Sequence, residues 1–162
     1  MDEYRVAAEW IGVPVLALPA IHYIEANLER TRNVGGAFML DRGGDGTTMF
    51  DKNIRDYERI VAKRLNISPV PKVSRDFWFA ATCAAYELRE KRRGRGWGRD
   101  VLADAMWGYN GRPKSHRTWR DSAYVWNDPK RGRRIWVCGR TKTYLCERPG
   151  AIVIYDEIKR RL

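Results

Sequence analysis

The chain has 162 residues, 44% hydrophobic and 31% charged, proportions that exclude a disordered protein and predict one globular domain over residues 1–162. Its 31 Lys and Arg against 20 Asp and Glu give a formal net charge of +11, which indicates a polyanionic partner: nucleic acid, an anionic lipid surface or an anionic cell-wall polymer. Three cysteines are too few for a disulfide scaffold.

The first residues do not resemble a targeting segment. Asp2 and Glu3 make the start acidic, and the apolar run over residues 13–20 is short and contains two prolines. We therefore expect no signal peptide and no membrane span.

The first predicted helix follows Pro14 and carries Glu25 near its end. Ile21, Ile24 and Leu28 fall on one helical face, and Glu25 lies at the edge of that face. Partial burial and the negative end of the helix dipole both raise the pKa of such a carboxyl, as a general acid requires. A merely solvated glutamate is the commoner situation at a helix end, and these residues alone leave both interpretations open.

Caps, breakers and apolar spacing predict five later helices, which makes the fold mainly α with about six helices. Their expected ranges are 51–66 (capped by Asp51), 74–93 (capped by Ser74 or Asp76), 99–110, 118–126 and 151–162. Residues 34–46 are glycine-rich and predict a loop or small β element after the first helix. Residues 135–146 predict a short hairpin around Gly139 or an ordered loop.

Most of the excess positive charge lies in one stretch. Residues 89–134 contain 14 Lys and Arg but only 5 Asp and Glu. This stretch is either a polyanion-binding surface or a solvated basic face. Trp97, Trp119 and Trp126 lie within it and are expected to stack on bases or sugars, or to pack in the core.

The cysteines and histidines do not have metal-ligand spacing. Cys83 lies among alanines and is expected to be a buried thiol, whereas Cys138 and Cys146 either meet across the hairpin or are free. His22 and His116 stand alone in the sequence. We expect neither a metal nor a cofactor.

Three short motifs occur in a characteristic order. Glu25 ends a helix, Gly36-Ala37-Phe38-Met39 lies in the glycine-rich turn, and residues 105–111 read Ala-Met-Trp-Gly-Tyr-Asn-Gly. This order resembles the lytic transglycosylases of the lysozyme-like superfamily, in which a catalytic Glu, a Gly-Leu-Met/Phe-Gln type motif and an Ala-x-x-x-Tyr-Asn motif follow one another. Residues 122–126, Ser-Ala-Tyr-Val-Trp, are similar to a segment that follows Tyr-Asn-Gly in bacteriophage members. Ala26 and Met39 depart from the Ser and Gln usual there, and the loss of that Gln removes one side-chain polar contact.

The resemblance implies an α+β lysozyme-like fold and the cleavage of peptidoglycan glycan strands. It makes Glu25 the catalytic residue and implies a substrate-binding set consisting of Gly36, Phe38, Met39, Tyr109, Asn110 and Tyr124. A single Glu suffices in such enzymes, which form a 1,6-anhydro-MurNAc end. The positive charge then suits anionic cell-envelope polymers.

Two alternatives stay open beside this expectation. Asp41 or Asp45 would supply a second carboxylate in a hydrolytic muramidase, although turn capping suits both residues. A basic nucleic-acid-binding or virion structural protein without activity is the other alternative. Without a signal peptide, a phage product made in the host cytoplasm is expected to reach the bacterial wall during lysis or, packaged with other virion proteins, during entry.

Overall fold

The computed structural model describes residues 2–26, 28, 38, 54–73, 75–112, 116–127, 133–137, 140–144 and 148–162. Within these ranges the chain is mainly helical, as predicted, with one short hairpin. The elements are α1 (Asp2–Ile11), α2 (Ala17–Ala26), α3 (Ile54–Arg64), α4 (Phe77–Lys91), α5 (Arg99–Tyr109), the 3₁₀ helix η3 (Trp119–Asp121), β1 (Arg133–Val137), β2 (Arg140–Tyr144) and α6 (Ala151–Arg161). None of these helices is long and apolar enough to cross a membrane.

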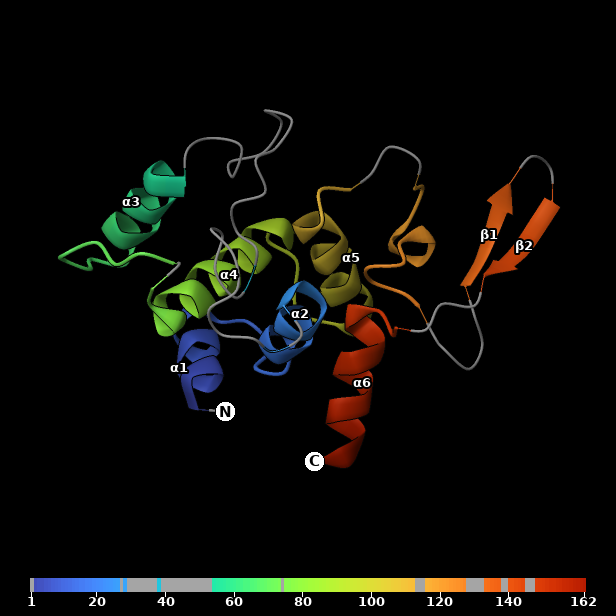
Figure 1. The fold of residues 1–162 in the computed structure, drawn as a ribbon, viewed down its shortest axis with the longest axis horizontal. Coiled ribbons are helices and arrows are strands. Elements are labelled where there is room, and N and C mark those ends of the chain that lie inside the picture. The colour runs from blue at the N-terminus through green and yellow to red at the C-terminus, as the bar shows by residue number, and fades with distance from the viewer. Residues whose placement is uncertain are drawn as a thin grey trace.

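Helix α4 lies at the centre of the helical assembly (Figure 1). It contacts α1, α2, α3 and α5, and every residue from Phe79 to Leu88 is buried. Its many alanines let the neighbouring helices approach closely, and Thr82 and Glu87 are polar residues within this buried span. Asp76 caps this helix, as predicted, since its Oδ1 accepts a hydrogen bond from the Phe79 amide at 2.9 Å.

Helix α1 is absent from the helices predicted above. Ala7, Ala8 and Ile11 are its buried residues, and they pack α1 on α4. Their spacing is helical, and Asp2 and Glu3 lie in the first turn, where acidic residues favour a helix N-terminus. Asp2 and Glu3 therefore mark a helix start that the sequence prediction did not include.

The helix predicted over residues 118–126 is wrong beyond its first turn. Only Trp119–Asp121 is helical, as a 3₁₀ turn capped by the Thr118 hydroxyl. The carbonyls of Tyr124, Val125 and Asn127 instead accept hydrogen bonds from the first amides of α6. This segment therefore satisfies the free amides at the start of another helix, a long-range role that local periodicity does not reveal.

Helix α6 begins against the core and then leaves it. Only Ala151 and Ile152 are buried, while the expected inward residues Ile154, Tyr155 and Ile158 are only partly covered. The first turn of α6 packs beside α2 and α5, and its C-terminal end extends away from them (Figure 1). Strands β1 and β2 form an antiparallel hairpin in which Arg133 pairs with Tyr144, which confirms the hairpin prediction.

Candidate active site

Glu25 lies one residue before the end of α2 and is partly buried. This position agrees with the sequence prediction. Leu28, which was expected on the same buried face, is instead 50% exposed and has a backbone φ of +64°. Helix α2 has already ended at Ala26, so Leu28 no longer follows the helical register.

A buried aromatic cluster supports α2 one turn before Glu25. His22 is fully buried, and its Nδ1 is hydrogen-bonded to the Tyr4 hydroxyl of α1 at 2.7 Å. The ring centroid of Phe38 lies 5.0 Å from that of His22 and 5.8 Å from that of Phe77. Phe38, the described residue of the glycine-rich segment, is therefore packed directly on the helix that carries Glu25.

The Tyr109 hydroxyl connects the third motif to the second. It donates a hydrogen bond to the Phe38 carbonyl at 2.9 Å, across 71 residues of sequence. Tyr109 is the last residue of α5, and Asn110 caps the helix by donating its amide to the Met106 carbonyl. Gly111, with φ of +82°, completes the turn. Segments that carry all three motifs thus meet through the contacts of Phe38.

Tyr124 lines a cavity beside Tyr23 and Ile24 of α2. The cavity has a volume of about 280 Å³, and the described residues that line it are Tyr23, Ile24, Ala123, Tyr124, Asn127, Arg148 and Pro149. Tyr23 and Ile24 immediately precede Glu25 in α2. The fourth sequence segment is therefore also near the C-terminal half of this helix.

Several residues named in the predictions, for the site, a helix cap and the hairpin, lie outside the part of the chain that the structure describes. They are Gly36, Met39, Asp41, Asp45, Asp51, Cys138, Gly139 and Cys146. Their assignments stay predictions. Cys83, by contrast, is fully buried, and burial raises the pKa of its thiol well above the usual value, so it is an inert core residue.

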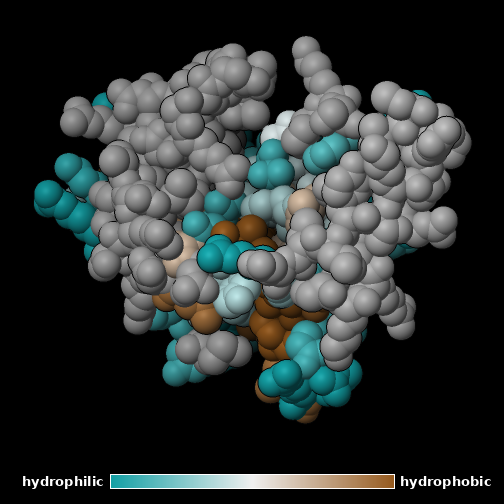
Figure 2. Space-filling model, turned by 45° about the vertical axis from the view of Figure 1, so that its right-hand side comes forward, coloured by the Kyte–Doolittle hydropathy of each residue, from teal (hydrophilic) through white to brown (hydrophobic). Residues whose placement is uncertain are grey.

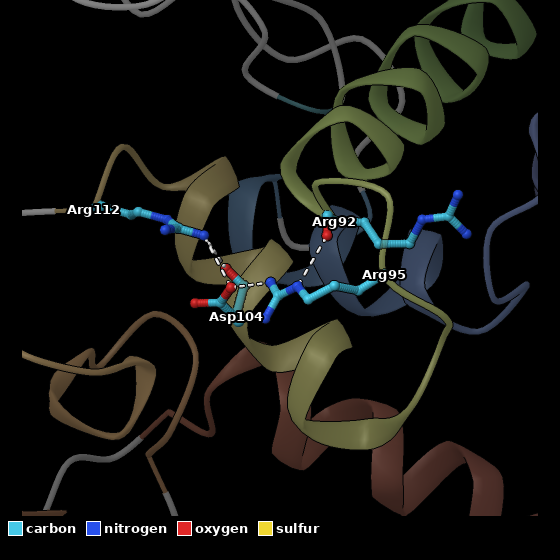
Figure 3. Close-up of polar contacts among 4 residues, drawn as sticks. All are labelled: Arg92, Arg95, Asp104 and Arg112. Carbon is cyan, nitrogen blue, oxygen red and sulfur yellow. Dashed lines mark hydrogen bonds and ion pairs between the residues drawn. The ribbon is translucent and has the colours of Figure 1, made fainter.

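Many arginines of the basic stretch are bound by the folded chain itself. Asp104 of α5 pairs with Arg95 and, at 3.0 Å, with Arg112 (Figure 3), and Asp156 pairs with Arg99 at 2.6 Å. Arg95 also donates to the carbonyl of Arg92, which fixes the loop between α4 and α5. These ion pairs hold loops in place, and the cations still contribute to the field of the molecule.

An arginine lies over the ring of each of the four tryptophans of this stretch. Arg120 lies 4.1 Å from the ring centroid of Trp119, and Arg92 lies 5.0 Å from that of Trp97. Trp119 is 6% exposed and meets Trp126 edge-on at 5.9 Å. Core packing, one of the two predicted roles, is therefore the role of Trp119.

Apolar side chains gather on the face of the molecule that Figure 2 presents. Figure 2 shows an apolar area in the middle of the face it presents, bordered by hydrophilic side chains.

Glu87 of α4 is a buried carboxyl that the sequence analysis missed. It is 2% exposed and lies 3.0 Å from the Lys91 ammonium. Burial raises its pKa above the usual 4.5, and Lys91 opposes this effect only in part. The one sequence signal was an acidic residue within an otherwise apolar stretch of helix.

This raised pKa predicts a specific pH dependence of stability. A carboxyl with a higher pKa in the folded state binds its proton more readily there, so the free energy of unfolding gains a contribution as pH falls from 7 toward 4.5. Glu87→Gln should remove that contribution, whereas Glu9→Gln, at an exposed glutamate of α1, should keep it. Urea unfolding between pH 4.5 and 7 measures the difference. Parallel pH curves for wild type and Glu87→Gln would contradict the assignment.

His22, Asn127 and Arg148 were also not predicted to belong to the site. His22 carried a usable signal, because it lies three residues before Glu25 on the same side of a helix. Asn127 and Arg148 carried none, because only the fold brings residues 123–127 beside residues 148–149. Among the described residues, no three His, Cys, Asp or Glu side chains gather into a possible metal site.

Comparisons with protein-family models, curated proteins and solved structures find no match to this chain.

Proposed function

We propose that this protein is a lytic transglycosylase that cleaves the MurNAc–GlcNAc β-1,4 bond of peptidoglycan, with Glu25 as its acid and base. The hydrogen bond from the Tyr109 hydroxyl to the Phe38 carbonyl carries the proposal. It joins two of the three motifs, and the contact of Phe38 with His22 joins them to the helix of Glu25. This contact, across 71 residues of sequence, supports a common site for the motifs.

The proposed reaction needs one carboxyl group in two protonation states. Protonated Glu25 gives its proton to the glycosidic oxygen as the bond to C1 of MurNAc breaks, and the N-acetyl carbonyl oxygen supports the cation. Ionised Glu25 then takes the proton of the MurNAc 6-hydroxyl, whose oxygen bonds to C1 and closes the 1,6-anhydro ring. The carboxyl returns to its starting state without water being consumed.

The other predicted residues bind substrate in this proposal. Tyr109 fixes the chain at Phe38, so that backbone groups over residues 36–39 receive the N-acetyl group. Asn110 holds the turn that follows Tyr109, and Tyr124 lies along the glycan path. The mainly helical fold and the partial burial of Glu25 support these roles.

The positive charge fits a wall substrate. Peptidoglycan and the polymers attached to it are anionic, and a net charge of +11 attracts them over long range. This proposal includes a bacteriophage product that acts at the cell wall, during lysis or entry.

The products of purified protein on isolated peptidoglycan test the proposed function. Soluble fragments with 1,6-anhydro-MurNAc ends are expected. Reducing MurNAc ends would instead establish a hydrolytic muramidase. No soluble fragments, together with DNA binding that weakens steeply with salt, would establish the non-enzymatic alternative.

Tyr109→Phe tests the contact that carries the proposal. Loss of one partly buried hydrogen bond should lower the free energy of unfolding by about 1 kcal/mol and slow glycan cleavage, because Phe38 is no longer held. Tyr155→Phe, on the partly buried face of α6, is the matched control and should change neither quantity. Denaturant unfolding and the rate of fragment release measure the two effects. An unchanged rate in Tyr109→Phe would remove this residue from the site.

A further inference from the structure

The cavity between α2 and residues 123–127 has properties that the cleavage step does not use. Its described walls are apolar or aromatic at Ile24, Pro149 and the two tyrosines. Among these lining residues, Arg148 is the only charged one. It is exposed, and its guanidinium forms no ion pair with any described residue. A cation beside an apolar cavity attracts an anionic group that carries an apolar part.

Asn127 adds a second polar group to the same cavity. Its side chain is 2% exposed, and its Nδ2 donates to the Arg148 carbonyl. Its Oδ1 is buried and accepts no hydrogen bond from the described residues. A buried amide oxygen without a donor is costly, so a group that enters the cavity and donates an N–H gains affinity there.

These features specify the chemistry of the ligand. It has an amide N–H for Asn127, a carboxylate for Arg148 and a small apolar side chain for the walls. A volume of about 280 Å³ suits one or two amino-acid residues. An N-acylated dipeptide with a free carboxylate has all of these properties.

We propose that this cavity binds the start of the peptide stem that peptidoglycan carries on MurNAc, with the amide N–H on Asn127 Oδ1 and a carboxylate on Arg148. The identity of this ligand rests on the proposed function, whereas the binding of an acyl dipeptide does not. Tyr23 and Ile24 line the cavity next to Glu25 in sequence, so a bound stem selects glycan strands that still carry peptide.

Binding of N-acetyl-alanyl-glutamate to the full chain tests the cavity alone. NMR titration should give saturable shifts in wild type, with affinity at least about tenfold lower in Arg148→Ala and for the fully amidated dipeptide. Arg75→Ala removes an equally exposed arginine next to α4 and should leave the affinity unchanged. Ala123→Trp fills the cavity from its exposed rim without removing charge and should also abolish binding. Equal affinity for the acid and its amide, or no saturable binding, overturns the proposal.

Cleavage of two glycans tests the role of the cavity in substrate selection. Wild type should cleave peptide-bearing strands faster than strands stripped by an amidase, and Arg148→Ala and Ala123→Trp should bring that ratio close to one. Arg75→Ala should retain the wild-type ratio, and retention of the ratio in Arg148→Ala overturns the selection role. If wild type cleaves neither glycan, the proposed function is wrong. The dipeptide titration then tests by itself whether the cavity binds an acyl dipeptide.

Discussion

Glu25→Gln is expected to reduce glycan cleavage by roughly a thousandfold, because positioned acid–base groups commonly contribute 10²–10⁴-fold and Glu25 serves as both acid and base. Glutamine keeps the size and hydrogen-bonding reach of the side chain but cannot transfer the proton. At a partly buried position near the end of α2, this exchange should leave the fold intact. Release of fragments from isolated peptidoglycan measures the rate, and circular dichroism checks the fold.

Glu9→Gln is the matched control for this result. Glu9 is an exposed glutamate of α1 that pairs with Arg5 at 3.3 Å, so its loss removes one negative charge away from α2. Wild-type cleavage is expected in that variant. If Glu25→Gln cleaves as fast as Glu9→Gln, Glu25 is not the catalytic acid.

Gly150→Ala is expected to lower the free energy of unfolding by about 3 kcal/mol, at the upper end of overpacking costs. A Cβ atom at position 150 would lie 2.4 Å from the Val125 carbonyl oxygen and 2.7 Å from the Asn127 amide nitrogen. Both are backbone atoms, so no side-chain rotation relieves the clash. The segment over residues 124–127 must move, and its hydrogen bonds to the first amides of α6 are then weakened.

Gly96→Ala provides the comparison for this prediction. An added Cβ there meets no atom within 4 Å. Thermal unfolding should therefore separate the two variants clearly, with Gly96→Ala close to wild type. Equal melting temperatures would mean that residues 124–127 do not pack on Gly150 as described.

The sequence predicts the helices best where local signals agree. Asp76 caps α4, and the Asn110-Gly111 turn ends α5, at the expected positions, because capping and chain reversal depend on neighbouring residues. The failure over residues 118–126 has a long-range cause. The carbonyls of residues 124, 125 and 127 accept hydrogen bonds from backbone amides more than twenty residues later in the chain. A local sequence pattern does not indicate such contacts.

In the candidate site, too, local features were predicted and long-range contacts were not. Glu25 and Tyr109 were proposed from motifs, and the structure connects Tyr109 to Phe38. His22 was regarded as an isolated histidine, although it is buried and packs against Phe38 on the helix that carries Glu25. The cavity residues Asn127 and Arg148 become neighbours only because α6 begins against residues 124–127. The helix ends at Glu25 and Asn110 were therefore predictable from local sequence, whereas the tertiary contacts of these segments were not.

The hydrogen bond between Tyr4 and His22 has a consequence for mutational screens. Tyr4 belongs to α1, yet its hydroxyl holds the histidine on which Phe38 packs. A library scored for wall clearance should therefore return Tyr4 among its loss-of-activity positions, although Tyr4 is assigned no contact with the glycan. Distance from the glycan alone would not predict this effect of Tyr4. The contacts from Tyr4 to His22 and from His22 to Phe38 do predict it.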